Sequence, residues 1–197
     1  IDTEGYANAE QKLVYKSIFY DDAQEFLIES NDQQKRWLYD NIEIPNFKII
    51  SFSSNQYGDR FPTAIINQNI ELPAYATKTG NRLFVPLKMM DRDGYVPRKL
   101  NDRKTDIYIR RGYVRIDTIK YMLPEGYRIE YKPDDFIVES VFGSCSSRVI
   151  ESGDGILYIR KSETNKGIFP KAEYNNMIDY YKQIARADKA QLVLVKQ

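Results

Sequence analysis

Polar and hydrophobic residues alternate over most of this chain, and a period of two is the pattern of half-buried β-strands. In residues 63–72, Ile66 and Ile70 fall on one side of such a strand while Asn67 and Asn69 fall on the other. This arrangement predicts an antiparallel sheet with one face in water. Similar runs predict strands over residues 9–17, 47–53, 82–89, 113–123, 127–131, 136–142, 146–150, 156–161 and 191–195.

Some of these runs carry irregularities. Pro86 cannot donate a ladder hydrogen bond, so its strand is expected at a sheet edge or at a bulge. In residues 113–123 the apolar side changes after Ile116, which predicts a β-bulge near Asp117. The Ser-Gly-Asp-Gly sequence of residues 152–155 predicts a tight hairpin between the strands on either side of it.

Three segments have the spacing of helices. A first short helix is expected with Asp22 as its N-cap, and a second over residues 33–41 after the cap candidates Asn31 and Asp32. A longer helix is expected over residues 170–187, because its first residue is a proline, which suits a first helical turn. Its apolar stripe comprises Tyr174, Met177, Ile178, Tyr181, Ile184 and Ala185.

Together these elements predict a mainly β protein with α+β elements, built from two small antiparallel β-sheets or sandwiches. The first sub-domain, residues 1–92, carries the pair of short helices. The second, residues 106–197, is backed by the amphipathic C-terminal helix and closed by a final strand. Residues 93–105 are charged, contain Gly94 and Pro97 and lack periodicity, so they form the expected junction.

Composition removes several classes of function. The chain has no histidine and one cysteine, Cys145, so histidine-based catalysis, an internal disulfide and a cysteine-rich zinc site are not expected. Its 29 basic and 28 acidic residues nearly cancel, and nucleic acid is therefore not an expected partner. We expect no membrane span, because every apolar run is too short, and we expect no cofactor.

Several short motifs, in their order along the chain, resemble a bacterial family. They are the run from Asp117 to Tyr127, then Phe142-Gly143-Ser144, Gly167-Ile168-Phe169-Pro170 and Ala187-Asp188-Lys189, and upstream Gln34-Lys35-Arg36-Trp37-Leu38, Pro45-Asn46-Phe47, Tyr75-Ala76 and Gly80-Asn81-Arg82-Leu83-Phe84-Val85. Over nearly its whole length the chain is similar to the C-terminal region of unknown function that follows a transglutaminase-like domain in large secreted bacterial proteins. Such motifs mark turns and strands, so they imply an architecture and not an activity.

The resemblance implies a non-catalytic accessory module that packs on, or presents substrate to, the upstream transglutaminase-like domain of the same polypeptide. It also implies an extracytoplasmic location, in the periplasm or at the cell surface. The start at Ile1, without an initiator methionine or a signal peptide, indicates a piece of a longer protein. The catalytic Cys, His and Asp of such proteins lie upstream and match no position here, so the resemblance gives Cys145 no role as a nucleophile.

The residues themselves offer weak catalytic and metal candidates. Cys145 has neither a histidine nor a helix N-terminus beside it, so we expect an inert strand cysteine. Residues 91–94 match a calcium loop only in part. Paired carboxylates are the catalytic design that needs no histidine, although helix caps and turns explain the pairs of this chain more simply. These pairs are Asp21 with Asp22, Asp91 with Asp93, and Asp134 with Asp135.

A basic stretch with interleaved tyrosines is the candidate for a binding surface. Its seven cations are Arg98, Lys99, Arg103, Lys104, Arg110, Arg111 and Arg115, and only Asp102 and Asp106 oppose them. This composition predicts a site for an anion or a contact between domains, and a solvated face explains it equally well.

Aromatic residues make up 13% of the chain, which favours a carbohydrate-binding alternative if some of the rings are exposed. The candidates at helix or loop positions are Trp37, Tyr39, Tyr57, Tyr75 and Tyr95. The alternatives to an accessory module are therefore a β-sandwich module that binds carbohydrate or a polyanion and, with less support, a carboxylate-based hydrolase. A glycan or a protein is the ligand that fits the first of these.

Overall fold

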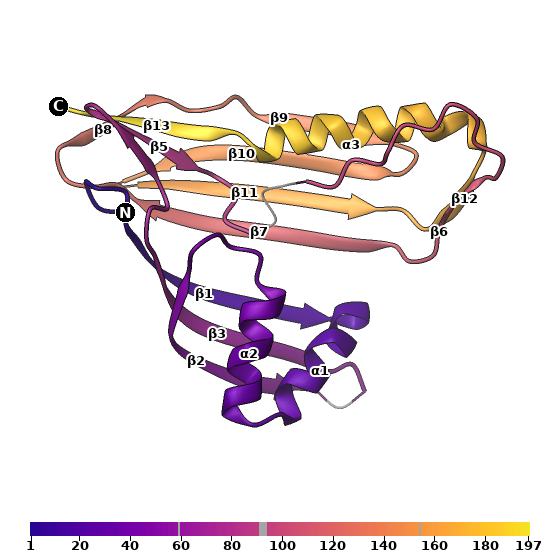
Figure 1. The fold of residues 1–197 in the computed structure, drawn as a ribbon, viewed down its shortest axis with the longest axis horizontal. Coiled ribbons are helices and arrows are strands. Elements are labelled where there is room, and N and C mark those ends of the chain that lie inside the picture. The colour runs from indigo at the N-terminus through magenta and orange to yellow at the C-terminus, as the bar shows by residue number, and fades with distance from the viewer. Residues whose placement is uncertain (59, 91–93, 154) are drawn as a thin grey trace. The chain divides into compact units, whose positions relative to one another are not determined.

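The computed structural model describes residues 1–58, 60–90, 94–153 and 155–197, and it divides into two compact units, Ile1–Thr77 and Lys78–Gln197. The strands pair antiparallel in four small sheets, and a long helix lies near the C-terminus (Figure 1). The prediction of a mainly β protein with antiparallel sheets and a C-terminal helix is confirmed.

The first unit is built on a three-stranded sheet. Its strands are β1 (Ala7–Lys16), β2 (Lys48–Tyr57) and β3 (Thr63–Leu72), in the spatial order β1-β3-β2. On β3, Ile66 and Ile70 are buried as predicted, whereas Asn69 is exposed and Asn67 is half-buried. The alternation of the sequence therefore sets which face of the central strand meets the core.

Two short helices, α1 (Tyr20–Ile28) and α2 (Asn31–Asn41), cover one face of this sheet (Figure 1). The Phe26 ring lies 5.1 Å from that of Trp37 and 6.3 Å from that of Phe52 on β2, measured between ring centroids. Aromatic rings from both helices and from the sheet thus pack together on this face. The helices leave the opposite face of the sheet exposed to water.

The predicted helix caps are wrong for both helices. A 3-10 turn, η1 (Ser17–Phe19), leads into α1, so the helix begins at Tyr20 and Asp22 lies within its first turn. α2 begins earlier than expected, because Ser30 caps it: the Ser30 backbone N–H donates to Gln33 Oε1 at 3.3 Å, and the two side chains are hydrogen-bonded. The Ser-x-x-Gln spacing of a capping box was the sequence signal for this start.

The second unit contains three small sheets. The largest has the order β7-β11-β10-β9, the second β4-β5-β13-β8, and the third pairs β12 with β6. The bounds of these strands are β4 (Thr77–Thr79), β5 (Arg82–Pro86), β6 (Ile107–Ile109), β7 (Tyr113–Met122), β8 (Tyr127–Tyr131), β9 (Phe136–Ser140), β10 (Gly143–Ser152), β11 (Gly155–Thr164), β12 (Gly167–Phe169) and β13 (Gln191–Lys196). β13, the predicted closing strand, lies between β5 and β8, and Leu192 and Leu194 are fully buried.

The helix α3 (Tyr174–Asp188) runs along β9 and β10 (Figure 1) and buries its predicted stripe. Tyr174, Met177, Ile178 and Ile184 pack with Phe142 and Cys145 in one cluster, and Tyr181 lies at its margin. Tyr180 also belongs to this cluster, although its position lies outside the predicted stripe. The helix begins later than predicted, because Pro170 precedes a 3-10 turn, η2 (Lys171–Glu173), and not the α-helix itself.

The predicted β-bulge near Asp117 is wrong. β7 pairs with β11 in unbroken register over all ten residues, from Tyr113 opposite Thr164 to Met122 opposite Gly155. The apolar phase changes because Val114 and Ile116 point away from α3 and are exposed. The sequence signal therefore reported apolar side chains on the outer face of the sheet and not an extra residue in the strand.

Pro86 is the last residue of β5, opposite Gln191 on β13. β5 lies between β4 and β13, and β4 is only three residues long. β5, which the sequence assigned to the first sub-domain, belongs to the sheet of the second unit, since it pairs with β13 near the C-terminus. The division after Thr77 thus lies ahead of the junction predicted at residues 93–105, of which residue 93 lies outside the described residues.

Candidate functional site

A network of buried charges lies between α3, β11 and the chain after β5. The Asp188 carboxylate accepts hydrogen bonds from Lys88 Nζ at 2.8 Å, from Arg160 Nε at 2.6 Å and from Arg160 Nη2 at 3.0 Å. All three side chains are at most 10% exposed. The Arg160 guanidinium also donates to Ser162 Oγ at 3.1 Å and lies 3.8 Å from a carboxylate oxygen of Asp117, which is partly in water.

The sequence brings these charges together through ordinary periodicities. Arg160 lies on the same face of β11 as the buried residues Ile156 and Tyr158, so it points to the α3 side of the sheet. Asp188 follows Ile184 by four residues and therefore continues the buried stripe of α3 to its last residue. These spacings were the available signal, but charged residues in apolar stripes do not reveal their partners.

The buried charges of this network pair with one another, as in a structural ion-pair network. Burial lowers the pKa of the Arg160 guanidinium, but the hydrogen bond and the charge of Asp188 outweigh this effect and hold the pKa above its ordinary value. Each buried charge is satisfied by an opposite charge, which is what burial requires. The network therefore ties the end of α3 to the centre of the largest sheet.

Cys145 lies beside this network and is buried. It stands on β10 opposite Ser162 on β11 and Val138 on β9, and it is 2% exposed. Burial raises the pKa of its thiol, and the positive charge of Arg160 opposes this only in part. The thiol is therefore protonated and shielded near neutral pH, as an inert strand cysteine would be.

We expect Cys145 to react with Ellman's reagent at pH 8 at least about 100-fold more slowly than free cysteine, because the protein must open first. In urea one thiol per chain should react fully. Because the folded thiol has the higher pKa, the unfolded thiol ionises first. The stabilising difference is therefore present below the ordinary thiol pKa and is lost as pH rises toward the folded pKa. Rapid reaction of the native protein at pH 8 would contradict this account.

The seven cations predicted as an anion site or domain contact fall into groups with different surroundings. Arg103 contacts other residues of the chain: its guanidinium lies 4.5 Å from the centroid of the Tyr174 ring, and it donates hydrogen bonds to the carbonyl oxygens of Thr105 and Asp106. Lys104 pairs with Asp102. The side chains of Arg98, Lys99, Arg110 and Arg111 are exposed, while Arg115 lies over the ring of Tyr113 at 5.5 Å.

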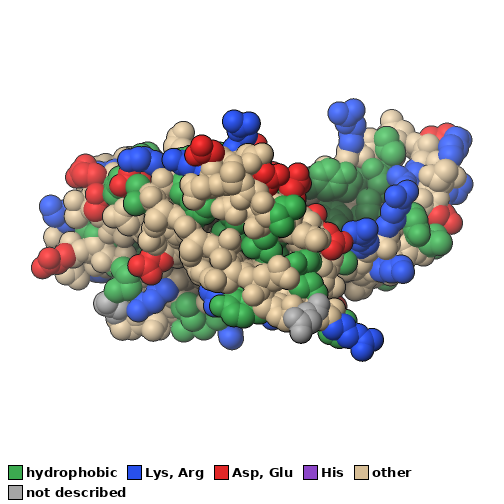
Figure 2. Space-filling view, turned by 90° about the horizontal axis from the view of Figure 1, so that it is seen from below, with side chains coloured by type: hydrophobic (Ala, Val, Ile, Leu, Met, Phe, Trp, Pro, Cys, Tyr) green, Lys and Arg blue, Asp and Glu red, His purple; other side chains and the backbone are tan. Residues whose placement is uncertain are grey.

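Basic side chains are scattered among acidic and polar ones on the face that Figure 2 shows. The loop between β6 and β7 lies close to a further cation, because a Cβ added to Gly112 would lie 3.6 Å from Lys166 Cβ. That loop carries Arg110 and Arg111. An anion site at these cations therefore stays a prediction.

The other sequence candidates are dispersed. Asp21, Asp22, Asp134 and Asp135 are exposed in a first helical turn and in the chain between β8 and β9, while Asp91, Asp93 and the possible calcium loop at residues 91–94 fall largely outside the described residues. Of the aromatic candidates, Tyr75 is buried and Trp37 packs on Phe26, whereas Tyr39, Tyr57 and Tyr95 are exposed. Within the described part, no group of three His, Cys, Asp or Glu side chains is arranged to hold a metal ion.

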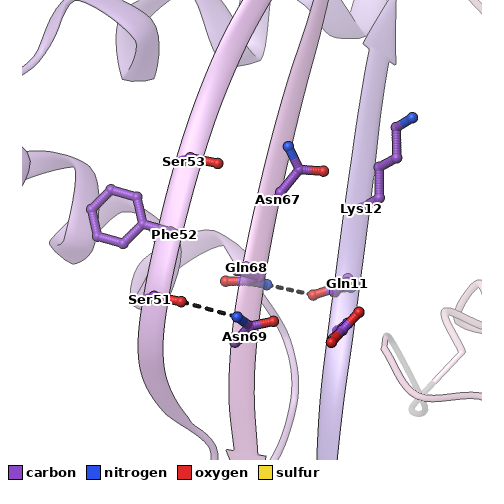
Figure 3. A pocket seen from close by; sticks show the side chains of 9 residues that line it. Gln11, Lys12, Ser51, Phe52, Ser53, Asn67, Gln68 and Asn69 are labelled. Atoms are coloured by element: carbon purple, nitrogen blue, oxygen red, sulfur yellow. Dashed lines mark hydrogen bonds between the residues drawn. The ribbon is translucent and has the colours of Figure 1, made fainter.

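A polar groove lies on the water-facing side of the first unit's sheet (Figure 3), and the sequence analysis did not single it out as a site. Its volume is about 420 Å³. The side chains that face it come from all three strands: Glu10, Lys12, Ser51, Ser53, Asn67 and Asn69. Gln11, Phe52 and Gln68 also line it but alternate with these residues, so their side chains belong to the helix-covered side of the sheet.

The two units define a mainly β protein in which a helix-backed antiparallel sheet holds a buried charge network. The model of the family described as "Domain of Unknown Function with solved-structure structure (DUF3858)" matches residues 81–194, and the chain belongs to this family. The match contains the whole charge network. No curated protein and no solved structure matches the chain. The association with a transglutaminase-like domain stays a prediction.

None of the helices in the described part of the chain combines the length and the apolar character needed to cross a membrane.

Proposed function

We propose that this chain is a non-catalytic accessory module that packs against a transglutaminase-like domain of the same polypeptide and helps to present its substrate. The extracytoplasmic location expected from the resemblance is part of this proposal. Two features support a role without catalysis. The thiol of Cys145 is buried and protonated, and the buried charges satisfy one another.

The observation that carries the proposal is a set of exposed apolar side chains on the outer face of the β7-β11-β10-β9 sheet. Ile116 on β7 is 65% exposed, Ile137 on β9 is 77% exposed, and Val114 and Ile150 are exposed as well. The continuous register places all four on the side of the sheet opposite the α3 cluster. Ile116 and Ile137 lie in one row across the sheet, with Lys161 and Ser146 between them. Several exposed apolar side chains on one sheet face favour a surface that another domain covers.

The parent protein provides the test. We expect Ile116→Asp combined with Ile137→Asp to lower the affinity of this chain for the catalytic domain at least about tenfold. Each isoleucine contributes roughly 1–2 kcal/mol to that affinity when the other domain covers it. Limited proteolysis and the activity of the parent would measure this loss. Ile168→Asp is the matched control, since Ile168 on β12 is 70% exposed and belongs to another sheet.

Deletion of residues 1–197 from the parent should reduce its activity, its solubility or its correct localisation. The accessory role fails if this deletion leaves all three properties unchanged. It also fails if Ile168→Asp disturbs the parent as strongly as the double substitution on the outer face does.

A further inference from the structure

We propose that the polar groove of the first unit binds a neutral oligosaccharide. This inference goes beyond the accessory role, because it concerns a different unit and a different surface. The groove is formed by two rows of side chains that cross the sheet. Lys12, Asn67 and Ser53 face one another in the first row, and Glu10, Asn69 and Ser51 form the second. The two rows and the three strands give a grid of about 10 by 7 Å.

The central strand β3 departs from the composition of an ordinary strand at this place. Asn67, Gln68 and Asn69 are consecutive, and asparagine is depleted in strands because it packs poorly on a pleated surface. Long charged or β-branched side chains would serve a merely solvated face better. A local choice that opposes strand propensity, placed at the centre of a groove, is the kind of exception that marks a functional site.

The hydrogen-bonding groups in the groove are only partly used by the protein. Asn69 Nδ2 donates to Ser51 Oγ at 3.1 Å, which leaves the other amide proton and the carbonyl oxygen of Asn69 for a ligand. In the described part of the chain, the side chains of Asn67, Ser53 and Lys12 make no hydrogen bond. The groove thus offers donors and acceptors side by side, and a sugar hydroxyl is both a donor and an acceptor.

Charge and shape decide among the classes of ligand. Glu10 and Lys12 are the two charges that face the groove, and they cancel, so a polyanion has no electrostatic advantage there. An extended peptide gains its affinity from strand pairing at a sheet edge and from apolar pockets, but this groove lies on a face and has no apolar side chain on its floor. Phe52 is turned to the opposite side, where it packs on Phe26.

The borders of the groove fit a ligand of one or two sugar rings. The exposed ion pair between Lys48 Nζ and Glu71, 3.3 Å long, lies in the next row at one end. Val14 and Ile65 form the next row at the other end. A volume of about 420 Å³ lies within the usual range of small-molecule sites.

The test uses the whole chain and defined probes. The probes are neutral hexasaccharides of β-1,4-glucose, β-1,4-N-acetylglucosamine, α-1,4-glucose and β-1,4-xylose, together with a heparin fragment and a polar hexapeptide. Titration is followed by isothermal calorimetry and by amide chemical shifts in ¹H–¹⁵N spectra. We expect at least one neutral hexasaccharide to bind and to shift the amides of β1, β2 and β3 around residues 10–12, 51–53 and 67–69.

The variant pair is matched for fold stability. Asn67→Thr combined with Asn69→Thr removes the amides while raising strand propensity, and it should weaken binding at least tenfold. Asn55→Thr, on the same face of β2 but outside the groove, should leave binding unchanged. Spectra of each free variant show that it is folded.

The proposal is overturned if no neutral hexasaccharide binds at concentrations up to about 10 mM. It is also overturned if only the heparin fragment or the peptide shifts these amides, or if the double threonine variant binds as well as the unaltered chain. None of these results bears on the accessory role, which is measured in the parent protein on the sheet of the second unit.

Discussion

Replacement of Asp188 with alanine is expected to destabilise the second unit by about 3–5 kcal/mol, because it removes the one buried carboxylate that pairs with both buried cations of the network. Lys88 Nζ and Arg160 Nε lie 2.8 and 2.6 Å from the Asp188 carboxylate, and the Asp188 side chain is only 4% exposed. The side chains of both cations are at most 10% exposed. Urea denaturation, followed by far-ultraviolet circular dichroism, would measure the free energy of unfolding.

Asp179→Ala is the matched control for this prediction. Asp179 lies on the same helix and pairs with Lys182 at 3.5 Å, but both side chains are more than half exposed. Its loss should therefore change the stability by less than about 0.5 kcal/mol. The triple variant Lys88→Met, Arg160→Met and Asp188→Leu should recover most of the stability that Asp188→Ala loses, because no buried charge remains. An Asp188→Ala protein as stable as the Asp179→Ala control would contradict the proposed importance of the network.

Replacement of Gly143 with alanine is expected to cost more than about 3 kcal/mol, because both the backbone conformation and the space available require glycine. Gly143 begins β10 with φ of +145°. A Cβ built there would lie 1.9 Å from the carbonyl oxygen of Glu163 on the adjacent β11, which is backbone and cannot turn aside. The substitution should therefore push β10 away from β11 beside Phe142, which is fully buried.

Gly126→Ala separates the two causes. Gly126 also has a positive φ, +75°, but a Cβ there meets nothing within 4 Å. Only the conformational cost of about 1–2 kcal/mol is then expected. Thermal unfolding of both variants, compared with the unaltered chain, would measure the difference. If Gly143→Ala were no more destabilising than Gly126→Ala, the close approach of β10 to β11 would not limit this position.

The fold was predictable where the periodicity of the sequence is set by one buried face. β3 occupies the predicted residues, and the stripe of α3 is buried as its spacing indicates. The predictions failed where a neighbouring residue competes for the same role. Ser30 caps α2 in place of Asn31 or Asp32, and 3-10 turns precede both α1 and α3. Helix ends depend on single hydrogen bonds, and periodicity does not report these.

The candidate sites were less predictable than the fold. The sequence indicated correctly that Asn67 and Asn69 lie on a wet face, but the groove requires Lys12 and Ser53 from other strands in a particular register. The charge network joins Lys88 to Asp188, which are 100 residues apart. No local pattern contains such a pairing, because it depends on how β13 brings the end of α3 toward β5.

The sequence by itself determined that this protein is mainly β, that Cys145 lacks the histidine that would activate it, and which residues of most strands and of α3 face the core. These properties follow from the order of residue types along one segment. The tertiary structure alone decided which strands are neighbours, that Val114 and Ile116 are exposed on an unbroken strand, and that Arg160 meets Asp188. Such pairings arise from the packing of segments that are distant in the sequence. The periodicity of one segment does not report which other segment it packs against.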